Sequence, residues 1–303
     1  MKVLITGASG AIGTAVTEVL LARGDTVVGL TRSPEAAREK EPGVIWHAWE
    51  PTLERPPAEA FDGVDGVINL VGEKIDQRWT DEAKERIMES RRSGTRNLVD
   101  AIAGLERKPK VLVNQSAVGY YGERGDTIVD ESDSGGTGDF ASEVVGAWEA
   151  AAREIEGTGV RLAIVRTGVV LDPASGMLKR LLLPFKAGVG GPLAGGRQYL
   201  SWVHIEDAIG VLLWALDSEN VEGVVNAAAP DPVTNKDFSK ALGRALRRPA
   251  VMPVPGFALN VILGREAAEH TAKSSIRVMP TRTRELGYEF RHPQLQGALS
   301  DLL

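Results

Sequence analysis

A glycine-rich stretch near the N-terminus constrains the fold of this chain more than any other feature. Gly7, Gly10 and Gly13 follow an apolar run at residues 2–5, which predicts a buried strand, and they precede a helical apolar pattern at residues 15–23. In such a turn the first glycine permits the tight bend, the second admits a pyrophosphate, and the third lets the helix approach the strand. Free amides and the helix dipole favour phosphate. We predict a dinucleotide site, with a plain structural turn as the alternative.

Strand-like and helix-like patterns alternate through the first half of the chain. Short apolar runs predict strands at residues 26–30, 44–49, 66–71, 111–114 and 161–165. Apolar residues at helical spacing predict helices at residues 81–104 and 140–156. Because helical crossovers between parallel strands are right-handed, this alternation predicts a doubly wound α/β fold with a parallel Rossmann sheet.

The pattern changes after Arg166. Glycine and proline crowd residues 188–196, residues 224–227 predict one more strand, and residues 235–247 predict a helix. We therefore predict a dinucleotide-binding domain and a smaller C-terminal cap that binds substrate. The first spans residues 1–170, with residues 203–228 returning to its sheet, and the cap comprises residues 171–202 and 229–303.

Composition narrows the class of protein. A net charge of −6 without a basic run argues against nucleic acid as a partner, and no apolar stretch reaches the roughly 18 residues that span a bilayer. The chain has no cysteine, which fits the reducing cytoplasm. Its four histidines, His47, His204, His270 and His292, lack the spacing of metal ligands. We expect a cytoplasmic protein that acts on a small molecule and holds no metal.

The end of the second predicted strand bears on the choice of cofactor. NAD-specific folds place a carboxylate there, about 20 residues beyond the glycines, to bind the ribose 2′-hydroxyl. This chain has Thr31, Arg32 and Ser33 instead. A guanidinium and a hydroxyl suit a 2′-phosphate, which predicts NADP(H) rather than NAD(H). A solvated surface arginine is the alternative.

Several further motifs resemble those of an extended short-chain dehydrogenase/reductase. More narrowly, the chain resembles the atypical epimerase-like branch known as TIGR-type NAD-dependent epimerase/dehydratase, over essentially its whole length. The motifs that carry the resemblance lie at residues 69–73, 78–80, 90–91, 94–98, 116–122, 148–149, 166–171 and 195–207. The resemblance implies nucleotide-sugar chemistry only loosely, since this branch brings no single substrate with it.

The predicted cofactor contacts extend beyond the three glycines and the strand end at Arg32. They are Ser9, Ala11, Ile12, Leu70, Val71, Gly72, Glu73, Arg91, Ser116, Arg166, Gly168 and Val169.

The usual proton relay is incomplete. Enzymes of this superfamily use a tyrosine, a lysine and a serine or threonine beside the nicotinamide. By the family pattern Ser116 fills the last role, although a strand-end serine can also serve a local backbone group. No register of residues 140–149 supplies Tyr-x-x-x-Lys, and Arg91 replaces an asparagine often found four residues before the helix threonine. The branch that the chain resembles shares the missing Tyr-Lys pair.

A tyrosine elsewhere is a candidate replacement. Tyr120 and Tyr121 follow Ser116 closely, and Tyr121 matches the family's Tyr-Gly pair, so we predict Tyr121 as the proton donor. Arg91 could lower a phenol pKa or clamp an anionic substrate. The alternatives are a packed aromatic turn and a pairing of Arg91 with Glu73.

The predicted substrate contacts are polar or aromatic residues near strand ends and in the cap. They are Lys74, Trp79, Tyr120, Arg197, Gln198 and Trp202. Arg78 and Trp79 could instead anchor the next helix. We expect Asp207 to cap the apolar helix that follows it, and His204 to be a buried residue rather than a base.

Two functions fit these features. One is an NADP(H)-dependent oxidoreductase or epimerase-like enzyme acting on a small polar carbonyl or hydroxyl compound. The other is an NADP(H)-binding sensor or scaffold that has lost proton transfer. The long helices from Asp81 and from Phe140 could form a homodimer or could face solvent.

Overall fold

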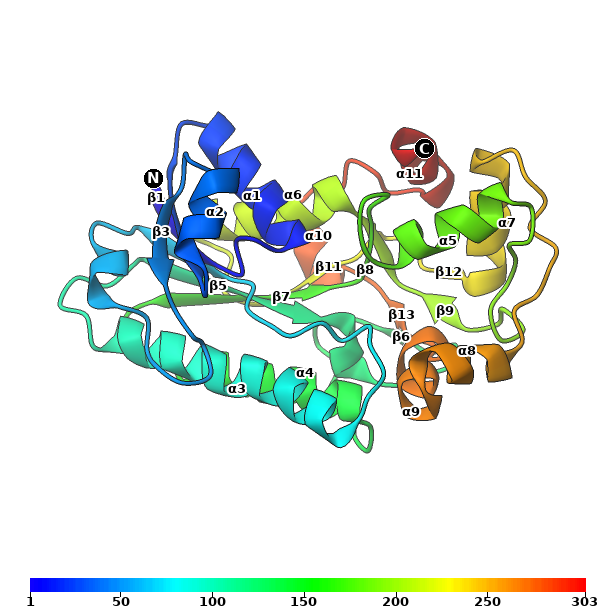
Figure 1. Ribbon diagram of the computed structural model, residues 1–303, viewed down its shortest axis with the longest axis horizontal. Helices are drawn as coiled ribbons and strands as arrows, with labels where there is room; N and C mark the ends of the chain where they lie inside the picture. The colour runs from blue at the N-terminus through cyan, green and yellow to red at the C-terminus, as the bar shows by residue number, and fades with distance from the viewer.

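A seven-stranded parallel sheet forms the centre of the larger unit (Figure 1). The computed structural model describes residues 1–257, 259–261 and 264–303. In spatial order the strands are β11 (Gly223–Ala227), β7 (Arg161–Thr167), β5 (Val111–Ala117), β4 (Gly66–Asn69), β1 (Lys2–Thr6), β2 (Thr26–Thr31) and β3 (Ile45–Ala48). This order is doubly wound about the β1–β4 boundary, which confirms the predicted fold class.

Helices cover both faces of the sheet, as side-chain alternation along the strands requires. On one face Val3 and Ile5 of β1 pack with α1 (Ala11–Ala22), α2 (Pro34–Lys40) and α6 (Ile205–Asp217). On the other face Leu4 packs with α3 (Asp81–Ala103) and α4 (Phe140–Arg153). Because strands buried on both sides are apolar throughout, short apolar runs identified them well.

The smaller unit is built around its own apolar cluster. Trp202 and Phe238 lie in this cluster with residues of α5 (Gly176–Lys186), α7 (Asn235–Ala245) and α11 (Leu295–Leu302). Two two-stranded sheets join the smaller unit to the larger one: β8 (Val169–Leu171) with β10 (Trp202–His204), and β6 (Ile128–Val129) with β13 (Arg277–Val278). A third, β9 (Tyr199–Leu200) with β12 (Val233–Thr234), lies within the smaller unit. The remaining helical segments are η1 (Ala58–Phe61), η2 (Val118–Tyr121), α8 (Gly256–Leu263), α9 (Arg265–Ala267), η3 (Ala268–Ala272) and α10 (Thr281–Glu285).

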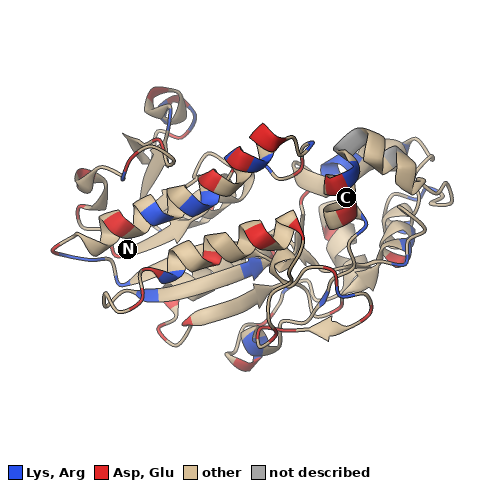
Figure 2. Cartoon of the chain, turned by 90° about the horizontal axis from the view of Figure 1, so that it is seen from below, with Lys and Arg blue, Asp and Glu red and all other residues tan. Residues whose placement is uncertain are grey.

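Charges of both signs lie along α3 and α4, the two helices nearest the viewer in Figure 2. Arg96 of α3 pairs with Glu154 just after α4 at 2.7 Å, with both side chains largely exposed. Within the described residues, no helix combines the length and the apolar content needed to cross a bilayer.

The sequence prediction for the start of α6 is wrong. His204, and not Asp207, caps the helix, because its Nδ1 accepts a hydrogen bond from the amide of Glu206 at 3.1 Å. The Asp207 carboxylate instead accepts the amides of Arg291 and His292 at 2.8 and 2.9 Å. These partners lie more than 80 residues away in the chain, so local capping rules could not identify them.

Because His204, the N-cap residue of α6, is buried, we expect the stability of the protein to depend on pH. Burial lowers the pKa of His204, and the stacked ring of His292 lowers it further, while the carboxylates of Glu206, Asp301 and Asp207 oppose the shift. The unfolded chain binds this proton more readily than the folded protein does. The free energy of unfolding is therefore highest above the ordinary histidine pKa of about 6.5, and it falls as the pH decreases toward the lower pKa of His204 in the folded protein. Urea unfolding between about pH 7.5 and 5.5 measures this.

The variant His204→Asn keeps a capping oxygen but does not titrate. We expect its stability to change less with pH than that of the wild type. His47→Asn, on the edge strand β3, is the matched control and should keep the wild-type pH slope. Equal slopes for all three proteins would rule out His204 as the source.

Candidate functional site

The glycine turn between β1 and α1 is open to a phosphate. Gly7 has φ +63°, in the left-handed region that favours glycine. The Gly10 amide donates to the Gly7 carbonyl at 2.9 Å. A Cβ on Gly13 would lie 2.3 Å from that same carbonyl oxygen. Helix α1 starts at Ala11 without a side-chain cap and without an acidic residue in its first turn. The first amides of α1 are therefore left for an anion.

The end of β2 lies beside this turn. Strands β1 and β2 pair in parallel with Thr6 opposite Leu30, so Thr31, Arg32 and Ser33 come next to the glycines. The Arg32 and Ser33 side chains are exposed, and α2 begins directly after them. This placement is the one that a 2′-phosphate contact needs.

A buried polar network supports the neighbouring loop, and sequence reasoning missed it. Asn69 accepts from Thr6 Oγ1 at 2.6 Å and donates to Thr95 Oγ1 at 3.0 Å and to Asn114 Oδ1 at 2.6 Å. All four residues are fully buried. Thr6 Oγ1 also accepts the amides of Leu70 and Val71. The network thus fixes residues 70 and 71 at the carboxyl edge of the sheet. The hint in the sequence is the polar residues at the strand ends.

Arg91 holds the far end of the same loop. Its Nη1 donates to the carbonyls of Glu73 at 2.9 Å and Ile87 at 3.2 Å, and its guanidinium lies 5.0 Å from the ring of Trp148. A Cβ on Gly72 would approach the Arg91 guanidinium to 2.9 Å. Burial lowers the pKa of Arg91 to about 10, which the charge of Glu73 opposes. Arg91 remains a cation at neutral pH and shapes the loop through a backbone carbonyl.

Ser116 belongs to a buried ionic cluster. Its hydroxyl donates to Glu149 Oε1 at 2.6 Å, and Arg166 binds both oxygens of Glu149 at 2.8 and 2.9 Å. Burial alone would lower the pKa of Arg166, but the hydrogen bonds and charge of Glu149 outweigh it and raise that pKa. Glu149, supplied by α4, is a residue whose role sequence reasoning missed.

Both tyrosines pack against this cluster. The Tyr121 hydroxyl donates to Asn226 Oδ1 at 2.9 Å and accepts from Arg166 at 3.1 Å, and burial raises the pKa of Tyr121 to about 12. The Arg166 guanidinium lies 3.4 Å from the centre of the Tyr120 ring, and a Cβ on Gly135 would come within 3.0 Å of that ring. To donate a proton to a ligand, Tyr121 would have to leave Asn226, so its catalytic role stays a prediction.

Two predicted substrate contacts, Trp79 and Trp202, lie in the core of the protein. Trp79 is packed edge-on against Phe140 at 5.0 Å, and its Nε1 donates to the carbonyl of Ile75. Trp202 is fully buried, with its Nε1 bound to the carbonyl of Asp231. Large aromatic side chains occur both in hydrophobic cores and in ligand-binding clefts, and the sequence alone does not distinguish the two positions.

Of the other predicted substrate contacts, one is hydrogen-bonded within the protein and two are exposed to solvent. Gln198 donates to the carbonyls of Leu193 and Ala272, so it braces the cap. Lys74 and Arg197 are exposed and stay predictions. Gly168 lies where a Cβ would meet the Ser201 carbonyl at 2.7 Å, which fits a close-packed start to β8.

Three potential metal ligands gather at the start of α6. One nitrogen or oxygen of each of His204, Glu206 and His292 lies within 4.8 Å of the others. The two rings are stacked, with centroids 3.7 Å apart and planes 21° apart, whereas a bound ion lies in the plane of each ligating ring. Because Nδ1 of His204 accepts a hydrogen bond, the proton of the neutral ring lies on Nε2. This geometry suits a stacked pair of rings, each hydrogen-bonded to Glu206, rather than a metal centre.

Comparisons with known proteins identify the family of this chain. The family model "NAD dependent epimerase/dehydratase family" matches residues 3–228, and a "Domain of unknown function (DUF1731)" matches residues 254–302. The human epimerase family protein SDR39U1 is 36% identical over the whole of both chains, and an epimerase family protein of Mycobacterium bovis is 39% identical over 98% of this chain and 96% of its own.

Solved structures give the same result. The human SDR39U1 protein crystallised with NADPH superposes with a TM-score of 0.90 at 37% identity, covering 100% of this chain and 99% of that one. A nucleoside-diphosphate sugar epimerase from Corynebacterium glutamicum superposes with a TM-score of 0.79 at 31% identity. The match covers 100% of this chain and 58% of that one. The chain therefore belongs to the NAD-dependent epimerase/dehydratase family, as an NAD(P)-binding protein with a Rossmann-type fold.

Proposed function

We propose that this protein is an NADP(H)-dependent oxidoreductase or epimerase-like enzyme that acts on a small polar carbonyl or hydroxyl compound. The observation that supports this most is the uncapped start of α1 beside the exposed Arg32. The amides of residues 11–13 would hold the diphosphate, and Arg32 with Ser33 would hold the 2′-phosphate. A bound nicotinamide supplies hydride exchange. The human relative was solved with NADPH, which supports this cofactor.

The choice of cofactor is tested at Arg32. Replacing Arg32 with alanine should weaken NADPH binding about ten-fold or more and leave NADH binding nearly unchanged, because only NADPH carries the 2′-phosphate. Titration of each cofactor, followed by nicotinamide fluorescence, gives the ratio. Arg38→Ala in α2 is the matched control. An unchanged NADPH/NADH ratio in Arg32→Ala would remove this assignment.

One observation favours the second candidate, an NADP(H)-binding sensor. The hydroxyls of Ser116 and Tyr121 are both buried and both engaged with neighbouring residues. Helix α4 contains neither a tyrosine nor a lysine, so the usual proton-transfer pair is missing from it. A protein that binds the cofactor without transferring protons needs no free hydroxyl beside the nicotinamide.

Turnover separates the two candidates. NADPH is mixed with a panel of carbonyl compounds, and the loss of nicotinamide absorbance is followed. Turnover that falls in both Ser116→Ala and Tyr121→Phe supports the enzyme and the predicted roles of these hydroxyls. Full turnover in both variants excludes those roles, and tight NADPH binding without turnover across the panel supports the sensor.

A further inference from the structure

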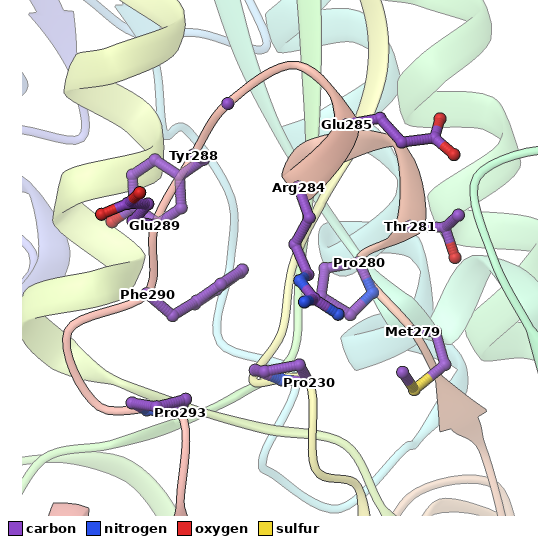
Figure 3. A pocket seen from close by; sticks show the side chains of 11 residues that line it. Pro230, Met279, Pro280, Thr281, Arg284, Glu285, Tyr288, Glu289, Phe290 and Pro293 are labelled. Carbon is purple, nitrogen blue, oxygen red and sulfur yellow. The ribbon is translucent and has the colours of Figure 1, made fainter.

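A hollow of about 650 Å³ lies at the β11 edge of the sheet, away from the glycine turn (Figure 3). Its walls come from Pro230 after β11, from the start of α10, and from the return segment at residues 287–293. Strand β11 is separated from the β1–β4 boundary by β7, β5 and β4. At about 4.8 Å per strand, the hollow is well over 10 Å from the crevice where the dinucleotide would bind.

The walls of the hollow are held rigidly. Tyr288 Oη donates to the Asp207 carbonyl at 3.2 Å, and the Asp207 carboxylate binds the amides of Arg291 and His292. On the opposite side, Asn226 Nδ2 donates to the carbonyl of Met279 at 3.0 Å, and Glu131 accepts the amides of residues 282 and 283. A site that is formed before its ligand arrives loses little entropy on binding.

The lining combines carbon surface with polar and charged side chains, which come from Thr281, Arg284, Glu285 and Glu289. Met279, Phe290 and the three prolines Pro230, Pro280 and Pro293 present carbon surface, and proline has no amide hydrogen to donate. The Phe290 ring is fixed edge-on against Tyr288 at 5.0 Å. The Tyr288 hydroxyl is already bound to Asp207, so it adds little to the polarity of the hollow.

Arg284 is the one cation among the described residues that line the hollow, and it is exposed to solvent. Its guanidinium extends into the hollow beside Pro280 and faces Phe290, while Glu285 points away (Figure 3). Within the described part of the chain, its side chain takes part in no hydrogen bond or ion pair. The planar fork of a guanidinium binds a carboxylate through two parallel hydrogen bonds.

We infer that this hollow is a second ligand site, for a small aromatic carboxylate. The carboxylate would bind Arg284, and the ring would lie against Phe290 and the prolines. The volume falls within the range of about 300–1,000 Å³ that is usual for small-molecule pockets. This inference is independent of the proposed NADP(H) site, because it uses none of the residues assigned to that site.

Fluorine NMR of 4-fluorobenzoate tests the inference on the full-length protein. We expect binding to the wild type, weakened about ten-fold in Arg284→Ala and less in Arg284→Lys, which keeps the charge but not the fork. Arg291→Ala is the matched control, since Arg291 is an exposed cation on the same return segment, and it should bind as the wild type does. The neutral analogue 4-fluorobenzyl alcohol should bind more weakly than the acid.

Three results would overturn the inference. They are equal binding by the wild type and Arg284→Ala, equal binding of the acid and the alcohol, and displacement of the acid by NADPH. NADPH binding is measured separately by fluorescence, so a failure of the cofactor site and a failure of this second site give different results.

Discussion

Replacing Glu149 with alanine is expected to lower the free energy of unfolding by about 3–5 kcal/mol. The carboxylate holds the Arg166 guanidinium through two hydrogen bonds, and both side chains are at most 4% exposed. Without Glu149 the guanidinium stays buried with its charge uncompensated, and Ser116 loses its acceptor as well. Urea denaturation of the two proteins gives the difference directly.

Glu154→Ala is the control for this prediction. Glu154 pairs with Arg96 on the surface, where such pairs contribute less than about 1 kcal/mol. A double variant, Glu149→Leu with Arg166→Met, should recover part of the loss, because it removes both buried charges together. If Glu149→Ala cost no more than Glu154→Ala, the ionic cluster would not support the fold.

Replacing Gly13 with alanine is expected to weaken NADPH binding about 100-fold, or about 2.7 kcal/mol. The new Cβ would lie 2.3 Å from the Gly7 carbonyl oxygen and 2.7 Å from the Ala8 Cα, so the turn must move away from α1. Its amides would then no longer converge on one diphosphate. Fluorescence titration with NADPH measures the affinity.

Gly24→Ala tests whether any glycine replacement near α1 has this effect. Gly24 has φ +82°, and a Cβ there meets nothing within 4 Å. This variant should lose about 1 kcal/mol of stability yet keep its affinity for NADPH. Near-wild-type NADPH affinity in a folded Gly13→Ala protein would mean that the cofactor does not sit on this turn.

The sequence was informative where one local rule decides the structure. Strands buried on both faces must be apolar throughout, so residues 2–5 and 161–165 were recognisable without any partner. The glycine turn is similar, because its bend and close approach depend only on local backbone. Helix α5 escaped notice because Pro184 stands inside it, and an internal proline ordinarily predicts a break.

The chemistry of the site was less predictable because it depends on distant partners. Ser116 faces Glu149, which lies 33 residues further along the chain, and Tyr121 bonds to Asn226, 105 residues further along. Whether a hydroxyl at a strand end faces a ligand or a buried carboxylate is decided by those partners. The core positions of Trp79 and Trp202 were unpredictable for the same reason, because they depend on neighbours that are distant in the sequence.

The hydrogen bonds between Asp207 and the return segment at residues 287–293 determine when the sheet domain can finish folding during synthesis. The edge strand β11 is held on its open side by Thr283, whose hydroxyl donates to the Asn226 carbonyl, and α6 is held by amides at residues 291 and 292. Residues 283–292 therefore complete a domain that the strands and helices of residues 2–227 begin. During synthesis, that domain cannot close before residues 283–292 have left the ribosome.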